Sequence, residues 1–265
     1  MKYIHTVLFL FLLAAVPAVA QQQITLQEIW GGAFRTKGMD DLQAMKNTNQ
    51  YTVLNYGSKN AQIDLYDFAT LNKVGTLIDT KDFKELQGID SYVFSPDEKK
   101  ILLATNSQQI FRHSFLADYF IYDIEKKSLT KLTAYKVQEP TFSADGKKVA
   151  YVLENNIYIY DIDTKRVDQV TKDGKQNSII NGVTDWVYEE EFAFVKAYDW
   201  NKTGDKVAYL RFDETQVPEF SMDIYGGSLY PQQNRFKYPK AGEKNSMVSL
   251  FIYDVKSGSS QQIAL

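Results

Sequence analysis

Short apolar strands separated by polar turns recur along most of the chain. Each unit opens with an aromatic residue and a polar turn, as in Phe94–Asp97 and Phe142–Gly146, and a looser copy lies at Trp200–Asp205. Pro, Asp and Gly have the backbone preferences that such turns require. An apolar strand is expected after each turn, at Ile101–Ala104, Val149–Leu153 and Val207–Leu210.

A second recurring feature is an aromatic strand that ends in Tyr-Asp. It occurs at Tyr66-Asp67, Tyr122-Asp123, Tyr160-Asp161 and Tyr253-Asp254. In the third unit, Val149–Leu153 and Ile157–Tyr160 flank Glu154–Asn156, which predicts a hairpin. Units of several short strands at a period of roughly 40–50 residues are typical of β-propeller blades. A β-sandwich whose turns happen to resemble each other is the alternative.

The sequence therefore predicts an all-β fold, with a partial β-propeller of about four blades over residues 46–265. Propellers close with about 4–8 blades, so either a four-bladed ring closes or this is the first part of a larger ring. The longest interval between the Tyr-Asp strands runs from Tyr160 to Tyr253. Insertions in repeat arrays map to loops on one face, often the binding face.

The first 20 residues have the pattern of a secretory signal peptide. Lys2 supplies the positive charge, Val7–Val16 is an apolar run, and Ala18–Ala20 is a small-residue cleavage site. An uncleaved anchor is the alternative, but the run is shorter than the ~18–20 residues that span a bilayer. Residues 21–45 form a lead-in, where Thr25 and Glu28 fit the capping box of a short helix. We expect export after cleavage near Ala20.

Candidate chemistry centres on Asp185–Phe192, where three consecutive glutamates lie inside an aromatic segment. Adjacent side chains point to opposite faces of a strand but lie about 100° apart on a helix. Glu190 and Glu191 can therefore share one cavity only from a helical or turn-like backbone. Carboxylates held that close favour a cation between them, and an ammonium group offers three donors. The hypothesis is capture of a substrate amine by Glu190 and Glu191; a solvated charged surface is the alternative.

The segment Phe111–Ser114 lies between two predicted strands of the second blade. Arg112 is either an exposed residue of a surface hairpin or points to the same cavity as Glu190 and Glu191. In that cavity its guanidinium would balance their charge and donate to a substrate carbonyl oxygen. We interpret His113 as structural, because His113 and the adjacent Ser114 would face opposite ways on a strand.

Composition narrows the chemistry further. The chain has 265 residues with a net charge of −3, which gives no argument for nucleic acid as a partner. It contains no cysteine and two histidines, of which His5 lies in the predicted signal peptide. Thiol catalysis and thiolate or multi-histidine metal sites are therefore excluded, and we expect no cofactor.

The segment Asp185–Glu191 resembles the double-glutamate motif of the dipeptidyl peptidase IV family of serine peptidases. Further similar segments are Ile24–Met39, Arg112–Ser114, Asn181–Phe192, Arg211–Glu214 to Glu219, and Tyr238–Gly242. The resemblance implies that Glu190 and Glu191 hold the N-terminal amine of a peptide and that Arg112 contacts its backbone. It also implies an eight-bladed propeller followed by an α/β-hydrolase domain that supplies Ser, Asp and His.

The family's serine elbow, Gly-x-Ser-x-Gly, is not found in this chain, and Gly226–Tyr230 comes closest. We therefore expect the N-terminal recognition part of an exported enzyme that removes Xaa-Pro or Xaa-Ala dipeptides, inactive without its C-terminal α/β-hydrolase domain. The expected partners are a peptide with a free N-terminus, that domain, and a second copy in a homodimer. The alternatives are a non-catalytic propeller that binds peptides or a protein, and a structural exported β-protein.

Overall fold

The computed structural model describes residues 23–36 and 42–264. The chain divides into two units, residues 1–39 and 40–265. In the first unit, helix α2 (Leu26–Trp30) begins with the predicted capping box, since the Glu28 N–H donates to Thr25 Oγ1 at 3.1 Å and the Thr25 N–H donates to Glu28 Oε2 at 2.8 Å. The predicted signal peptide at residues 1–20 lies outside the described residues.

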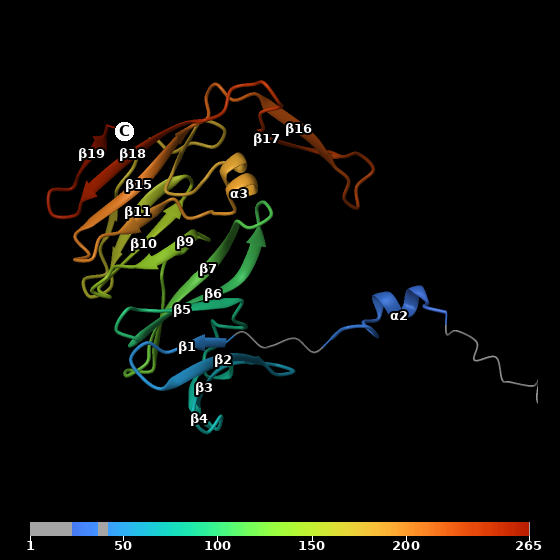
Figure 1. The fold of residues 1–265 in the computed structure, drawn as a ribbon, viewed down its shortest axis with the longest axis vertical. Coiled ribbons are helices and arrows are strands. Elements are labelled where there is room, and N and C mark those ends of the chain that lie inside the picture. Colours follow the sequence, from blue (N-terminus) through green and yellow to red (C-terminus); the bar gives the residue numbers. More distant parts are fainter. Residues whose placement is uncertain (1–22, 37–41, 265) are drawn as a thin grey trace, which may run out of the picture. The chain divides into compact units, whose positions relative to one another are not determined.

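The second unit is built from successive antiparallel sheets (Figure 1). The first sheet, in the order β1-β2-β3-β4, consists of Leu42–Ala44, Gln50–Tyr56, Ala61–Asp67 and Lys73–Asp79. A 3₁₀ turn, η1, follows at Thr80–Asp82. The second sheet, β5-β6-β7-β8, consists of Ser91–Phe94, Lys100–Gln109, Phe115–Asp123 and Ser128–Lys131.

The third sheet, β12-β11-β10-β9, is formed by Gln138–Phe142 (β9), Lys148–Leu153 (β10), Asn156–Asp161 (β11) and Val167–Gln169 (β12). The fourth, β13-β15-β18-β19 with β14 paired to β15, is formed by Ile179–Asn181 (β13), Tyr198–Trp200 (β14), Lys206–Asp213 (β15), Met247–Asp254 (β18) and Ser259–Ile263 (β19). Helix α3 (Trp186–Phe192) separates β13 from β14, and the hairpin β16 (Glu219–Ile224) and β17 (Gln232–Lys237) separates β15 from β18.

The polar turns repeat because the same hydrogen bonds close them. Ser95 Oγ donates to Asp97 at 2.6 Å and accepts from the Lys100 N–H at 2.9 Å. Ser143 makes the same two bonds, to Asp145 at 2.6 Å and from Lys148 at 2.9 Å. In the looser third copy, an asparagine side chain at position 201 takes over this role. The predicted turns are therefore confirmed as one structural unit used three times.

The Tyr-Asp strands end alike for a related reason. Each aspartate, at positions 67, 123, 161 and 254, accepts a backbone N–H three residues further on, at 2.8–2.9 Å. Such a bond favours a tight turn after the strand. The predicted hairpin of the third unit is also present, with Glu154 and Asn155 in left-handed backbone conformation at its tip.

Strands in the middle of the unit are buried on both faces. Ile101 and Leu103 of β6 pack into the core shared with the first sheet, whereas Leu102 and Ala104 pack into the core shared with the third. The residues of β10 alternate in the same way between the second and fourth sheets. This arrangement explains why these strands are continuous apolar runs rather than alternating ones.

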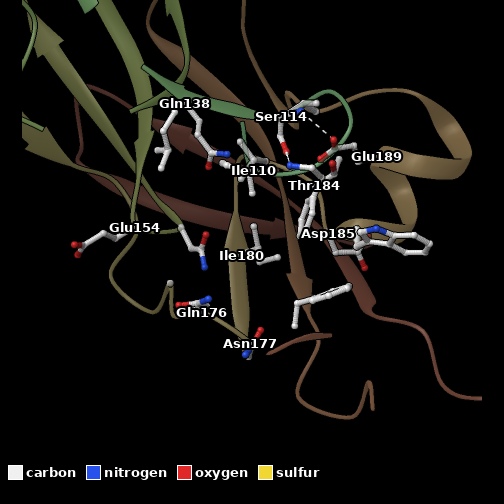
Figure 2. Close-up of a pocket in the computed structure, with 18 of the residues that line it drawn as sticks. Ile110, Ser114, Gln138, Glu154, Gln176, Asn177, Ile180, Thr184, Asp185 and Glu189 are labelled. Atoms are coloured by element: carbon white, nitrogen blue, oxygen red, sulfur yellow. Dashed lines mark hydrogen bonds between the residues drawn. The ribbon is translucent and has the colours of Figure 1, made fainter. Parts of the chain in front are cut away.

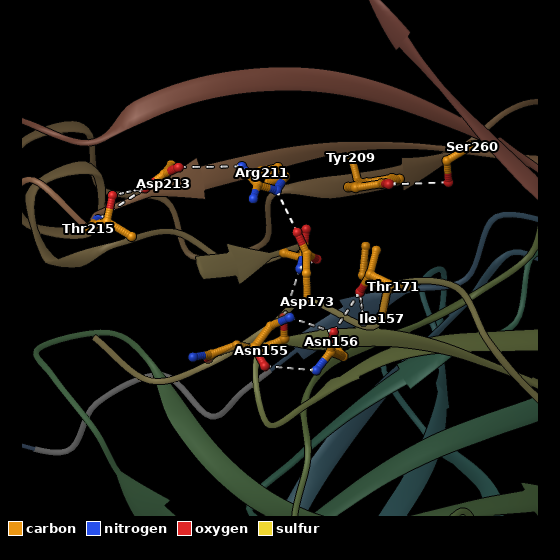
Figure 3. A network of polar contacts seen from close by, with 12 residues as sticks. Asn155, Asn156, Ile157, Thr171, Asp173, Tyr209, Arg211, Asp213, Thr215 and Ser260 are labelled. Atoms are coloured by element: carbon orange, nitrogen blue, oxygen red, sulfur yellow. Dashed lines mark hydrogen bonds and ion pairs between the residues drawn. The ribbon is translucent and has the colours of Figure 1, made fainter. Parts of the chain in front are cut away.

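A network of hydrogen bonds and ion pairs connects the third sheet to the fourth (Figure 3). Asp173, in the segment between them, accepts from Arg211 of β15 at 2.8 Å and from Asn181 of β13 at 3.0 Å. Asn181 also donates to the carbonyl oxygen of Asn155 in the β10–β11 turn, at 3.3 Å. The segment that leads into α3 is thereby tied to both neighbouring sheets.

The all-β fold with repeated antiparallel sheets is confirmed, and its first sheet already begins at Leu42. The number of blades in a closed ring stays a prediction. Within residues 23–36 and 42–264, no helix combines the length and apolar character that crossing a bilayer requires.

Candidate functional site

Helix α3 begins and ends at well-defined caps. The Asp185 side chain accepts from the Tyr188 N–H at 3.0 Å, and its other oxygen accepts from the Ser246 hydroxyl. The helix ends at Phe192, where Ala193 adopts a left-handed conformation with φ of 54°. An aspartate N-cap satisfies a backbone donor that the first turn leaves free. The segment of the glutamates is thus helical, as the hypothesis of a shared cavity requires.

Aromatic contacts hold this short helix in place. Tyr188 packs against Phe212 of β15, with ring centroids 5.0 Å apart, and against Phe194 at 5.9 Å. Trp186 packs against Tyr238, just after β17, at 4.5 Å. Isolated helices of this length are unstable in water, so these contacts and the cap fix where the glutamates point.

The three consecutive glutamates have three different environments. Glu189 is buried, with 1% of its surface exposed, whereas Glu190 is partly exposed and Glu191 is exposed. The 100° turn between successive helical residues accounts for the divergence. Only Glu189 faces the interior, so the two glutamates assigned to an amine lie toward solvent.

Arg112 and Glu190 form a forked ion pair. Arg112 Nε donates to Glu190 Oε2 at 3.0 Å, and Arg112 Nη2 lies 2.7 Å from Oε1. The structure therefore brings together two of the three residues singled out from the sequence. Glu191 follows on the same helix, and no hydrogen bond or ion pair of its side chain is found among the described residues.

Glu189 binds the main chain of the Arg112 segment. Its Oε1 accepts from the backbone N–H of His113 at 2.7 Å and of Ser114 at 2.9 Å. The His113 side chain is exposed and Ser114 is 3% exposed, but both lie in the loop between β6 and β7, so the strand alternation used in the prediction does not apply here. These two residues are not arranged as a catalytic pair.

A pocket of about 770 Å³ lies beside the buried face of the helix (Figure 2). Its lining residues include Ser114, Glu189, Gln138, Asn155 and Asn177. A pocket of this size is in the range that binds small molecules and peptide segments.

Two further carboxyl groups lie near α3 and have altered acidity. Burial raises the pKa of Glu214 to about 7, and the nearby Asp185 carboxylate adds to this shift while Lys237 opposes it. Burial also raises the pKa of Glu139, where Lys196 opposes the shift and Glu189 adds to it. The region around the helix is therefore rich in acidic groups, and Arg112 supplies a positive charge next to one of them.

Sequence reasoning missed the roles of Asp185 and Glu189. The signal for Asp185 was available, because aspartate just before a helical segment is a common N-cap. The 100° rule gives a signal for Glu189, since three neighbouring glutamates spread over about 200° of a helix that buries its aromatic side. Its partners are two backbone N–H groups 75 and 76 residues earlier, and their positions cannot be predicted from the order of side chains in the sequence.

Comparison with known proteins shows which family and which proteins this chain is similar to. Residues 95–265 match the family model described as the dipeptidyl peptidase IV (DPP IV) N-terminal region. The chain is 41% identical over 177 residues to dipeptidyl aminopeptidase B of Saccharomyces cerevisiae, covering 65% of this chain and 21% of that protein. It is 38% identical over 183 residues to dipeptidyl peptidase 4 of Felis catus, covering 66% and 24%.

Comparison with solved structures points to the same family as the sequence comparison. The crystal structure of Porphyromonas gingivalis dipeptidyl peptidase 4 is similar with a TM-score of 0.86 and 38% identity, over 92% of this chain and 35% of that one. The chain thus spans about a fifth to a quarter of the length of these curated relatives. The all-β sheets, the acidic helix and these matches together show that the chain belongs to the dipeptidyl peptidase IV family and carries sequence of its N-terminal region.

Proposed function

We propose that Glu190, Glu191 and Arg112 form the site that recognises the N-terminal amine of a peptide in a serine dipeptidyl peptidase. The forked pair of Arg112 with Glu190 carries the proposal, because it brings a cation from one sheet to the acidic helix of another. The family to which the chain belongs, and the peptidases that it resembles, support a dipeptidyl peptidase. The roles of the three residues rest on the resemblance of their sequence segments to that family.

The charges of the site suit one ammonium group. Arg112 balances Glu190, which leaves the charge of Glu191 for a cationic ligand. A guanidinium has five N–H donors, and the fork uses two of them. The remaining donors would bind a substrate carbonyl oxygen, while Glu190 and Glu191 accept from the amine. This division requires no metal or cofactor at the amine.

Hydrolysis would be done by a serine of an α/β-hydrolase domain outside these 265 residues. Its serine would attack the carbonyl carbon of the second residue while a histidine takes the serine proton and passes it to the departing amine of the third residue. The peptide bond between the second and third residues breaks, and water then releases the dipeptide from the acyl-enzyme. Anchoring the amine at a fixed distance from that serine would restrict cleavage to dipeptides. Pro or Ala as the second residue is the specificity that the resemblance implies.

Export and self-association belong to the same proposal. Cleavage near Ala20 would deliver the protein to the periplasm or the exterior, and N-terminal sequencing of the mature protein tests this. A homodimer remains a prediction, which sedimentation of the full-length protein checks.

The amine site is tested by steady-state kinetics of the full-length protein on a Gly-Pro p-nitroanilide. Changing Glu190→Gln and Glu191→Gln together should lower kcat/KM by at least about a hundredfold, because the bound ammonium group loses its charged partners. KM of the unchanged protein should rise above about pH 8, where an α-amino group loses its proton.

A matched control is Glu125→Gln, an exposed glutamate in the β7–β8 turn. It should leave kcat/KM unchanged. If the double variant cleaves the anilide as well as the unchanged protein does, the amine site is assigned to the wrong residues.

A further inference from the structure

We propose that Glu189 is a positioning residue, which fixes the loop that carries Arg112 and so sets the guanidinium against Glu190. This inference rests on the proposed function, because it concerns how one residue of the amine site is held. It assigns a task to the first glutamate of the triplet that differs from that of the other two.

The contacts of Glu189 are with the main chain of that loop. Its Oε1 accepts two successive N–H groups, from His113 and Ser114, directly after Arg112. Glu189 is 1% exposed and lines the pocket on the buried side of the helix, whereas Arg112 and Glu190 are not among the residues that line that pocket. For a ligand held at Glu190 and Arg112, the contact of Glu189 with the loop is therefore the route by which it acts on binding.

Several other polar groups of the loop are satisfied within the loop itself. The Gln109 side chain donates to the carbonyl oxygens of Phe111 at 2.6 Å and Arg112 at 2.9 Å. The Phe111 N–H donates to Ser114 Oγ at 3.3 Å, and the Ile110 N–H donates to the Ser114 carbonyl at 2.9 Å.

These bonds do not use the N–H groups of His113 and Ser114, and Glu189 accepts both. The loop is therefore a preformed turn that α3 holds at two points. Glu189 holds its main chain, as the dashed lines of Figure 2 show for Ser114, and Glu190 holds the Arg112 side chain.

Holding the main chain matters because the Arg112 side chain is long and 69% exposed. Ordering such a side chain costs conformational entropy, and that cost rises if its backbone also moves. A hydrogen-bond acceptor that is fixed in a buried place removes part of the cost before the substrate arrives. Loss of Glu189 should thus weaken binding through Arg112, with little effect on the chemical step.

The test is a double-mutant cycle in the full-length protein, with KM and kcat for a Gly-Pro p-nitroanilide as readouts. Glu189→Ala should raise KM by about tenfold, since two charge-assisted hydrogen bonds are lost, and should change kcat little. In the background of Arg112→Ala, the same change should raise KM by less than about twofold, because Glu189 can no longer position a guanidinium that is absent. Equal increases in both backgrounds, or no increase in either, overturn the inference.

A conservative variant separates positioning from general stability. Glu189→Gln keeps an oxygen that can accept both N–H groups, so its KM should stay within about threefold of the unchanged protein. If Glu189→Ala does not fold, the contrast is made with Glu189→Asp, whose shorter side chain withdraws the oxygen. Rescue by Gln but not by Asp supports the inference, whereas identical KM values for both variants contradict it.

Failure of the proposed function gives a different result. If Arg112 and Glu190 do not bind substrate, Arg112→Ala alone leaves KM unchanged. If they do and only the positioning role is wrong, Arg112→Ala raises KM while Glu189→Ala leaves it at the original value.

Discussion

Arg112 and Glu190 meet in a forked ion pair across 78 residues of sequence and across two sheets that are not neighbours. Arg112 belongs to the β6–β7 loop of the second sheet, while Glu190 lies on α3 within the fourth. The third sheet packs between them through two hydrophobic cores. The geometry of the site therefore depends on how three successive sheets are stacked, rather than on any one of them.

The two parallel contacts of the Arg112 guanidinium with Glu190 should contribute more to substrate binding than the positive charge alone. Arg112→Lys keeps the charge but cannot donate two parallel bonds to one carboxylate. We expect KM for a dipeptide anilide to rise by about three- to tenfold in the full-length protein, and further in Arg112→Ala.

The matched control for the fork is Arg166→Lys, because Arg166 makes an exposed ion pair with Asp168 in the third sheet. It should leave KM unchanged. Equal KM values for the unchanged protein, the Arg112→Lys variant and this control contradict a role for the fork.

Gly182 is a position at which a side chain should be poorly tolerated. Its φ is +78°, and an added Cβ would lie 2.7 Å from Ile157 Cγ1, a core atom of the third sheet. We expect Gly182→Ala to destabilise the protein by at least about 2 kcal/mol, from strain and overpacking combined. Thermal unfolding of the full-length protein measures this.

The control for that variant is Gly226→Ala, at which no atom lies within 4 Å of the added Cβ. Its melting temperature should match that of the unchanged protein. Equal melting temperatures for the two variants would mean that Gly182 is not packed as described.

Glu214 should make stability depend on pH. Its pKa is raised from 4.5 to about 7 in the folded protein, so the folded state holds a proton there that the unfolded state has lost. Stability from this group is complete below about pH 4.5 and declines as the pH rises through about 7. Glu214→Gln should therefore be more stable than the unchanged protein at pH 8, by roughly 2 kcal/mol after allowance for partial solvation, and similar to it at pH 4.5.

Differential scanning measurements at those two pH values test the Glu214 prediction. The gap in melting temperature should open as the pH rises. A constant gap would show that Glu214 is not protonated in the folded protein near neutral pH.

Much of the fold was predictable because it repeats. The Ser95 and Ser143 turns use identical bonds, and the Tyr-Asp strands end in the same aspartate-capped turn. Local hydrogen bonds of this kind leave a fixed order of residue types in the sequence. The helical backbone under Glu190 and Glu191 was likewise implied by steric alternation.

The site was less predictable because its partners are distant in sequence. No local rule predicts that the N–H groups of His113 and Ser114 donate to Glu189, nor that the Ser246 hydroxyl donates to the Asp185 cap. The raised pKa of Glu214 likewise depends on burial and on Asp185, which lies 29 positions earlier. These features follow from the packing of sheets, which is set by the whole chain.

The most direct test of the amine site compares binding of Gly-Pro and N-acetyl-Gly-Pro to the full-length protein by titration calorimetry. We predict that the free dipeptide binds at least about a hundredfold more tightly, because acetylation removes both the charge and the donors that Glu190 and Glu191 accept. Changing both glutamates to glutamine should abolish this preference. Equal affinity of the unchanged protein for the two dipeptides would contradict amine capture.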